Sequence, residues 1–304
     1  MRVVVEALWP VFTLIVLGAL FSHAGFPGGA FWPLAARFTY FALFPALLCR
    51  ELATARLEGL HLLPMGAALI GGVLALTLLL LVARPWTGLE GRAFGSVFQG
   101  SVRPNTYVGL AVAPPAAGVA GAPLAAVAIA ALVPLVNLLS VAVLSRYHTG
   151  GAPRWRETGW SIVTNPLLLA CVLGLALNRS GLGLLAGTGR TVEIFSRAAL
   201  PLGLLTVGAG LDLRALHAST YPIVLASALK LLALPAVTAA IGAVLGVGDA
   251  ARTVAILFAA LPCAPSAYVL AQQLGGDKEL MARILTAQTL LAAFTLPLVW
   301  ALLD

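Results

Sequence analysis

Long runs of apolar residues fill most of the chain, and short polar segments separate them. About 20 apolar residues in a helix cross the hydrocarbon core of a bilayer, so each run predicts one membrane-spanning helix. Turn signals such as GFPGG, ARPWTG, NRSGLG, GVGD and QLGGD fall between the runs. The pattern predicts an all-α polytopic membrane protein with ten transmembrane helices. The runs cover residues 3–21, 31–49, 62–83, 93–113, 122–145, 160–177, 192–211, 221–245, 253–271 and 284–303.

Composition agrees with a membrane protein and excludes a soluble one. The 304 residues are 61% apolar and 10% charged, whereas a soluble domain has about a quarter charged residues. A net charge of +7 would suggest nucleic acid as a partner of a soluble protein, but here Lys and Arg lie mostly in loops. We therefore expect the lipid bilayer as a partner and no nucleic acid. The basic loop RYHTGGAPRWRETG favours an orientation with both termini outside.

The two halves of the chain resemble each other. PVFTLIVLGALFSHAGF from Pro10 aligns with PLLLACVLGLALNRSGL from Pro166, and PNTYV at Pro104 aligns with PSAYV at Pro265. Five spans are an odd number, so the second copy must enter the membrane in the opposite orientation. Inverted repeats of this kind are typical of secondary transporters. We expect one repeat in residues 1–145, a basic connecting loop in 146–159 and a second repeat in 160–304.

Two of the predicted spans contain proline at their centres. Pro104 lies in the middle of the fourth run, and Pro262 and Pro265 lie in the middle of the ninth. Proline removes a helical hydrogen bond and clashes with the preceding turn, so both spans are expected to break. Broken helices at a repeat interface offer unpaired N–H groups and positive dipole ends to a substrate. The sequence therefore predicts the substrate site at these two breaks.

Polar and small residues beside the breaks are candidates for substrate binding. The Asn105 amide can donate to a carboxylate, accept from a cation or satisfy the broken backbone, and Ser266 occupies the corresponding place in the second repeat. Gly109 allows close backbone approach, and Tyr107 and Tyr268 supply amphipathic surface. The alternative that Asn105 only fills the kink stays open. The same candidate set includes Pro104, Thr106, Pro262 and Pro265.

Two cations lie deep in predicted spans. Arg103 is near the centre of the fourth run and Lys230 is deep in the eighth, where a charge costs about 2.5–3.5 kcal/mol on insertion scales. The acidic residues lie at or near span ends, so an anionic substrate would complete a positive midplane. Alternatively, Arg103 caps free carbonyls, and Lys230 either snorkels or replaces a coupling ion. Asn137 and Gln288, beside Thr289, either line the site or join helices.

No motif indicates an enzyme. Residues 246–249 read GVGD and match the GxGD string of intramembrane aspartyl proteases, but the chain has no Tyr-Asp pair to supply a second aspartate. HExxH and GxSxG are also absent. We expect no catalytic residue, no metal ligand and no cofactor.

The whole chain resembles the auxin efflux carrier family in its bacterial branch. The resemblance rests on FQGSVRPNTYVGLAVA from Phe98, LDLRAL from Leu211, LKLLALP from Leu229, LPCAPSAYVLAQQLGGD from Leu261 and QTLLAAFTLPL from Gln288. It implies ten helices in two inverted five-helix repeats, with helices 4 and 9 crossing at their broken centres. It also implies a scaffold of helices 1, 2, 6 and 7, through which a homodimer forms. Helices 3–5 and 8–10 would form a transport domain, in a bacterial inner membrane.

Bacterial members of that family are described as permeases for malate, malonate or similar acids. The resemblance therefore implies a secondary transporter of a small organic anion, with Pro104, Asn105, Pro265 and Ser266 at the crossing. Together with the deep cations, we expect alternating access in which the half-helix dipoles, Asn105, Arg103 and Lys230 hold a carboxylate. The alternative is a sodium-coupled symporter of the bile-acid type with a related crossed-helix fold. The sequence leaves open which acid is carried, in which direction, and whether a proton or sodium drives transport.

Overall fold

The computed structural model describes residues 2–149, 156, 159–160, 163–181, 184, 187–211 and 221–303. Within these ranges the regular structure is helical, apart from one isolated backbone bridge. The all-α prediction is therefore confirmed for the described residues. Most of the basic connecting loop and the LDLRAL segment after Leu211 lie outside them, as do the last residue and the first.

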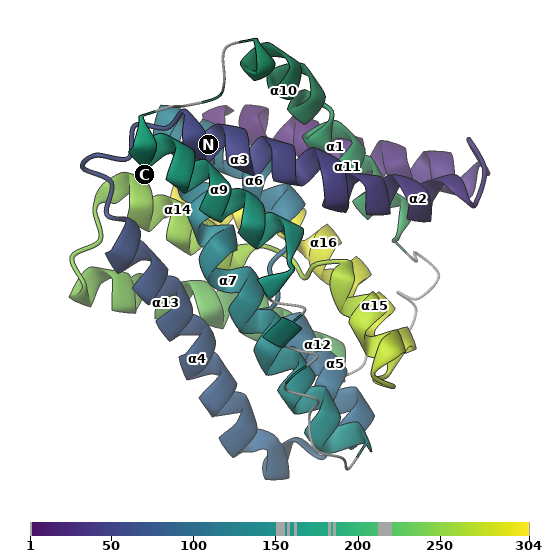
Figure 1. The fold of residues 1–304 in the computed structure, drawn as a ribbon. Helices are drawn as coiled ribbons and strands as arrows, with labels where there is room; N and C mark the ends of the chain where they lie inside the picture. Colours follow the sequence, from purple (N-terminus) through teal and green to yellow (C-terminus); the bar gives the residue numbers. More distant parts are fainter. Residues whose placement is uncertain are drawn as a thin grey trace.

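The first half of the chain forms seven α-helices and three short π- or 3₁₀-helical segments, all within the described residues (Figure 1). In chain order they are α1 (Arg2–His23), α2 (Phe31–Phe38), η1 (Thr39–Leu43), α3 (Phe44–Ala53), α4 (Leu62–Thr87), α5 (Gly91–Val102), α6 (Thr106–Ala117), η2 (Gly118–Ala120), α7 (Gly121–Leu144) and η3 (Ser145–Thr149).

The second half follows with helices that Figure 1 draws from green to yellow. The described elements are α9 (Pro166–Ser180), α10 (Thr188–Arg197), α11 (Ala199–Ala209), α12 (Tyr221–Ala228), η5 (Leu229–Ala233), α13 (Leu234–Val244), α14 (Asp249–Ala260), α15 (Ser266–Gln273) and α16 (Lys278–Ala301).

Six helical segments of the described chain are long and apolar enough to cross a membrane, and two shorter apolar helices accompany them. The predicted fourth and ninth spans are absent as single long helices because each is broken. The pieces on either side of the breaks have 12 residues in α5, α6 and α14 and 8 in α15, fewer than a span requires. The count of ten spans therefore stays a prediction.

Two pairs of helices from the two halves are equal in length. The first pieces of the broken spans, α5 and α14, have 12 residues each. The last helices of each half, α7 and α16, have 24 residues each. Glycines with positive φ stand at corresponding turns, which are Gly25 and Gly181, Gly88 and Gly246, and Gly118 and Gly275. These equivalences agree with the repeat read from the sequence.

Close helix packing joins the first helices of each half to those of the other. Helix α1 packs along α11, and α3 packs along α9. Added Cβ atoms would overlap the Leu205 carbonyl at Gly18 and the Ile15 carbonyl at Gly208. Small residues of this kind let the backbones of membrane helices approach.

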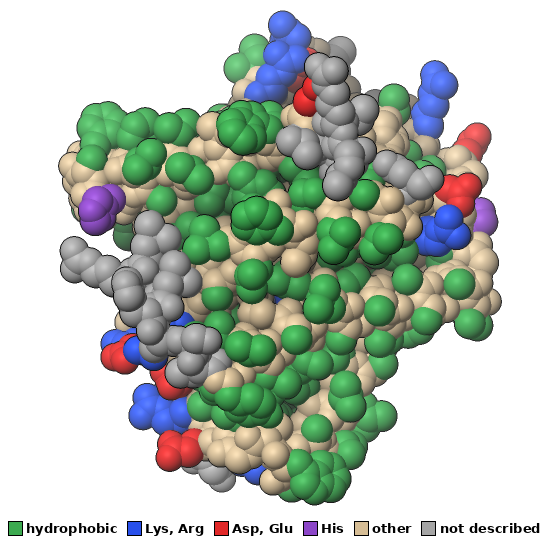
Figure 2. Space-filling view, turned by 180° about the vertical axis from the view of Figure 1, so that it is seen from behind, with side chains coloured by type: hydrophobic (Ala, Val, Ile, Leu, Met, Phe, Trp, Pro, Cys, Tyr) green, Lys and Arg blue, Asp and Glu red, His purple; other side chains and the backbone are tan. Residues whose placement is uncertain are grey.

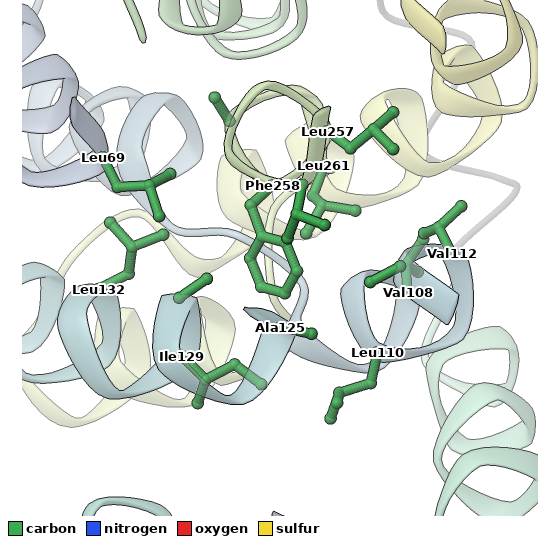
Figure 3. Close-up of a cluster of buried hydrophobic side chains, with 14 of the residues drawn as sticks. Leu69, Val108, Leu110, Val112, Ala125, Ile129, Leu132, Leu257, Phe258 and Leu261 are labelled. Atoms are coloured by element: carbon green, nitrogen blue, oxygen red, sulfur yellow. The ribbon is translucent and has the colours of Figure 1, made fainter. Parts of the chain in front are cut away.

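The helices of the breaks share a buried apolar core. Figure 3 shows Phe258 of α14 pointing between α6, which carries Val108, and α7, which carries Leu132. These three side chains are at most 2% exposed. The core therefore holds α14 against α6 and α7 just before the second break.

The outer surface is widely apolar. Figure 2 shows hydrophobic side chains over much of one face, with charged side chains toward its periphery. Trp9, Leu63 and Trp86 are among the large apolar side chains that are at least 70% exposed. Apolar area on this scale is unfavourable in water, and it matches a protein surrounded by lipid.

Candidate functional site

The two broken helices meet at their breaks. Helix α5 ends at Val102 and α14 ends at Ala260, and each is followed by an extended segment. Pro104 and Cys263 pair as an antiparallel bridge, and the Asn105 N–H donates to the Pro262 carbonyl over 2.8 Å. The predicted breaks are therefore confirmed, and the structure brings them side by side.

Proline explains the shape of both segments. Contact with the proline ring disfavours the helical region for the residue before proline. Arg103, before Pro104, has φ −85° and ψ 114°. Leu261, before Pro262, has φ −61° and ψ 145°. Each helix therefore ends just before a residue for which the following proline favours extended backbone.

Asn105 begins the second piece of the first broken helix. Its Oδ1 accepts hydrogen bonds from the N–H groups of Tyr107 at 3.1 Å and Val108 at 3.4 Å, as a helix N-cap does. This use fixes the orientation of the amide. Its Nδ2 is buried and has no hydrogen-bond partner among the described residues, so Asn105 is both a cap and a free donor.

Arg103 places a charge beside this donor. Its Nη2 donates to Asn137 Oδ1 at 2.8 Å and to Ser266 Oγ at 3.2 Å. Its Nη1 is buried without a partner, and Arg103 forms no ion pair in the described part of the chain. An unpaired buried charge is unfavourable unless another group compensates it. The guanidinium therefore offers both charge and a donor to an anion.

Both free donors belong to residues that line one pocket of about 470 Å³. One wall comes from the breaks and one face of α15, and the opposite wall comes from α2, η1 and α11. The lining residues are Pro33, Ala36, Arg37, Tyr40, Phe41, Arg103, Asn105, Thr106, Tyr107, Thr206, Ala264, Pro265, Ser266, Val269, Leu270 and Gln273.

The structure gathers part of the candidate set at this pocket. The candidates that line it are Arg103, Asn105, Thr106, Tyr107, Pro265 and Ser266. Tyr107 also joins the break to the start of α3, since its ring packs edge-on against Phe44 with centroids 4.5 Å apart. Ser266 differs from Asn105 in its role: it accepts from Arg103, whereas Pro265 is the N-cap of α15 and provides no side-chain cap.

Other candidates support the breaks without lining the pocket. Gln288 Oε1 accepts from the Cys263 N–H at 2.9 Å, and its Nε2 donates to the Gly100 carbonyl at 3.0 Å. Asn137 acts on the pocket through Arg103. Gly109 allows α6 to approach α14, since a Cβ there would lie 2.6 Å from Phe258 Cζ.

The remaining candidates also lie away from the pocket lining. Pro104 and Pro262 provide backbone partners at the crossing, and Tyr268 is half-buried on α15. Lys230 is fully buried, and its Nζ donates to the Ala259 carbonyl at 2.9 Å. It shares with Pro104 a separate void too narrow for water.

Sequence reasoning missed the opposite wall. Arg37 lies seven residues into the second apolar run, and the argument that singled out Arg103 applies to it as well. Tyr40, Thr206 and Gln273 had no comparable signal, because their place at the pocket depends on how helices distant in sequence pack. No cluster of three metal-ligating side chains occurs in the searched, described residues.

Comparisons with known proteins agree with the membrane character of the chain. Residues 155–300 match a family model described as membrane transport protein. The chain is also 28% identical, over 298 residues, to a protein of Methanothermobacter thermautotrophicus named as an uncharacterized transporter. That similarity covers 96% of both chains, so it includes both breaks and both walls of the pocket.

Proposed function

Because this chain belongs to the membrane transport protein family of the auxin efflux carriers, and is thus an integral multi-pass transporter, we propose that it moves a small organic anion. The proposed substrate is a carboxylate or dicarboxylate of the size of malonate or malate. The proposed mechanism is alternating access. Membership of a transporter family also fits a protein that is not an enzyme.

One observation supports an anionic substrate most directly. Arg103 Nη1 and Asn105 Nδ2 are buried donors without partners in the described structure, and both residues line the same pocket. A buried donor without an acceptor costs about 1–3 kcal/mol. A carboxylate would satisfy both donors and compensate the guanidinium charge. The pocket volume of about 470 Å³ falls in the usual range of small-molecule sites.

The proposed mechanism assigns the two pocket walls to two bodies. Helices α1, α2, α3, α9, α10 and α11 would form the scaffold and the dimer contact. Helices α4 to α7 and α12 to α16 would form the transport domain, within ten spans and two inverted repeats. The equal lengths of α5 and α14 and of α7 and α16, with the turn glycines, support the two repeats. The packing of α1 along α11 and of α3 along α9 supports the grouping of these helices as one scaffold. Movement of the breaks against α2 and α11 would then expose the pocket to either side.

Location and orientation complete the proposal. We place the protein in a bacterial inner membrane with both termini outside, because the basic connecting loop 146–159 would then face the cytoplasm. The coupling ion is either a proton or sodium. Lys230 would contribute positive charge at the C-terminal end of α14, where a helix dipole favours a cation.

The test is uptake by the purified protein in liposomes. Labelled malonate and malate would be compared with indole-acetate, under imposed proton and sodium gradients. Asn105→Asp is the informative variant, because aspartate keeps the helix cap and replaces the free donor by an oxygen. Saturable acid uptake by the wild type, lost in Asn105→Asp with unchanged Tm, would support the proposal. No uptake of any acid by folded wild-type protein would refute the anion assignment.

A further inference from the structure

One face of α2 and η1 forms the pocket wall opposite the breaks. Pro33, Ala36, Arg37, Tyr40 and Phe41 line the pocket at spacings of three and four residues, so they follow a single helical face. Three of these side chains are apolar, and two bear polar groups. The polar groups are the Arg37 guanidinium and the Tyr40 hydroxyl, which stand one helical turn apart.

Asn165 sets the direction of the Tyr40 hydroxyl. The Asn165 Oδ1 caps α9 by accepting from the N–H groups of Leu167 at 2.9 Å and Leu168 at 3.2 Å. Its Nδ2 donates to the Tyr40 oxygen at 3.1 Å. Because the cap occupies the oxygen of this amide, Asn165 can only donate to Tyr40. The tyrosine oxygen is then an acceptor on that side, and its own proton has no acceptor among the described residues.

Resting on the proposed function, we infer that Arg37 and Tyr40 bind a second polar group of the substrate, and that Asn165 acts as the positioning residue for Tyr40. The first carboxylate lies at Arg103 and Asn105. The second acceptor group of the substrate faces the Tyr40 proton and the Arg37 charge. This wall selects a dicarboxylate over a monocarboxylate of the same length.

Binding measurements on the purified full chain in nanodiscs test this inference. The probes are malonate, with two carboxylates, and propionate, with one. Tyr40→Phe removes only the hydroxyl. Asn165→Asp keeps the α9 cap, but its second oxygen accepts the tyrosine proton and turns it away from the pocket. Tyr221→Phe, at an exposed tyrosine at the start of α12, is the matched control.

We expect malonate affinity to fall about tenfold in Tyr40→Phe and in Asn165→Asp, as for loss of one hydrogen bond to a charged group. Arg37→Gln has an effect of similar size. Propionate affinity changes less than about twofold in all three variants. The double variant Tyr40→Phe/Asn165→Asp binds malonate no more weakly than the weaker single variant, because both changes remove the same donor.

Three outcomes overturn the inference while leaving the proposed function intact. In the first, Tyr40→Phe binds malonate as the wild type does. In the second, Tyr40→Phe weakens malonate and propionate equally. In the third, the losses of malonate affinity caused by the two substitutions add fully. That result would show that the carboxylate introduced by Asn165→Asp repels the anion directly and does not act through Tyr40. Wild-type protein that binds neither acid would instead contradict the proposed function.

Discussion

Asn137 Oδ1 accepts a hydrogen bond from Arg103 Nη2 at 2.8 Å, although the two residues are 34 positions apart. Asn137 lies within α7, and Arg103 directly follows α5 as its C-cap. A neutral amide orients the guanidinium here without cancelling its charge. The arrangement keeps Arg103 positive toward the pocket.

Asn137→Asp should weaken anion binding. A carboxylate at this position would form an ion pair with Arg103 and compete with the substrate, so we expect at least about a tenfold loss of affinity, equivalent to about 1.4 kcal/mol. Isothermal titration with malonate would measure it. Asn178→Asp, on α9 and outside the pocket, adds the same charge elsewhere. Because it also removes the Nδ2 bonds to the Ala53 and Ala55 carbonyls, its Tm is measured beside its affinity. Equal affinity in the wild type and Asn137→Asp would show that the Arg103 charge does not hold the anion.

Arg103→Met and Lys230→Met should differ in their effects on malonate binding, although both substitutions remove a deep cation and retain an apolar side chain. Arg103→Met removes a pocket donor, and malonate binding should fall by at least about tenfold. Lys230 lies outside the pocket and bonds to the Ala259 carbonyl. Its replacement should leave malonate affinity within about twofold while lowering stability by about 1–3 kcal/mol.

Measurements of malonate binding and of thermal unfolding on both variants distinguish the roles of Arg103 and Lys230. Loss of malonate binding in stably folded Lys230→Met would assign Lys230 to the substrate instead.

Gln288→Ala should destabilise the crossing. The side chain satisfies the Cys263 N–H and the Gly100 carbonyl, both buried, and each orphaned group costs about 1–3 kcal/mol. The Tm in detergent should fall by several degrees. Gln272→Ala, at an exposed position of α15, makes the same substitution and should change stability by less than about 0.5 kcal/mol. Similar Tm values for the two variants would show that the Gln288 bonds are dispensable.

Gly109→Ala should loosen the packing of α6 on α14. The added methyl group would lie 2.6 Å from Phe258 Cζ and 2.8 Å from Leu261 Cδ1, and overpacking of a core costs about 1–3 kcal/mol. Gly66→Ala within α4 meets no atom within 4 Å and should be neutral or stabilising. Combining Gly109→Ala with Phe258→Leu should restore part of the lost stability. Denaturant or thermal unfolding would measure the stability of these variants. Additive losses of stability in the double variant would argue against a direct clash between residue 109 and Phe258.

The breaks could be predicted from the sequence because proline acts locally. Pro104, Pro262 and Pro265 restrict their own backbone and that of the preceding residue, whatever surrounds them. Arg103 was also recognisable, since a charge in an apolar run requires an explanation. The fold class followed from apolar length, which the bilayer imposes directly.

Long-range packing determined what the sequence did not reveal. Tyr40 reaches the pocket only because η1 packs opposite the break, and its partner Asn165 is 125 residues away. Lys230 appeared equivalent to Arg103 by depth, but depth does not tell which side of the crossing a side chain faces. Gln288 was recognised as deep and polar, whereas its two bonds depend on the position of α16 against both breaks.

Arg103 and Asn105 each have more than one role at the first break, and Pro104 between them pairs across the crossing. Arg103 meets Asn137 and Ser266, Pro104 pairs with Cys263, and Asn105 caps α6 while its backbone N–H bonds Pro262. Few substitutions at this triplet can preserve all of these contacts at once. Related proteins with a different substrate are therefore expected to differ in α2 and η1. A side chain can change there without disrupting the contacts of the crossing. Differences in substrate among related carriers should therefore coincide with sequence differences in α2 and η1.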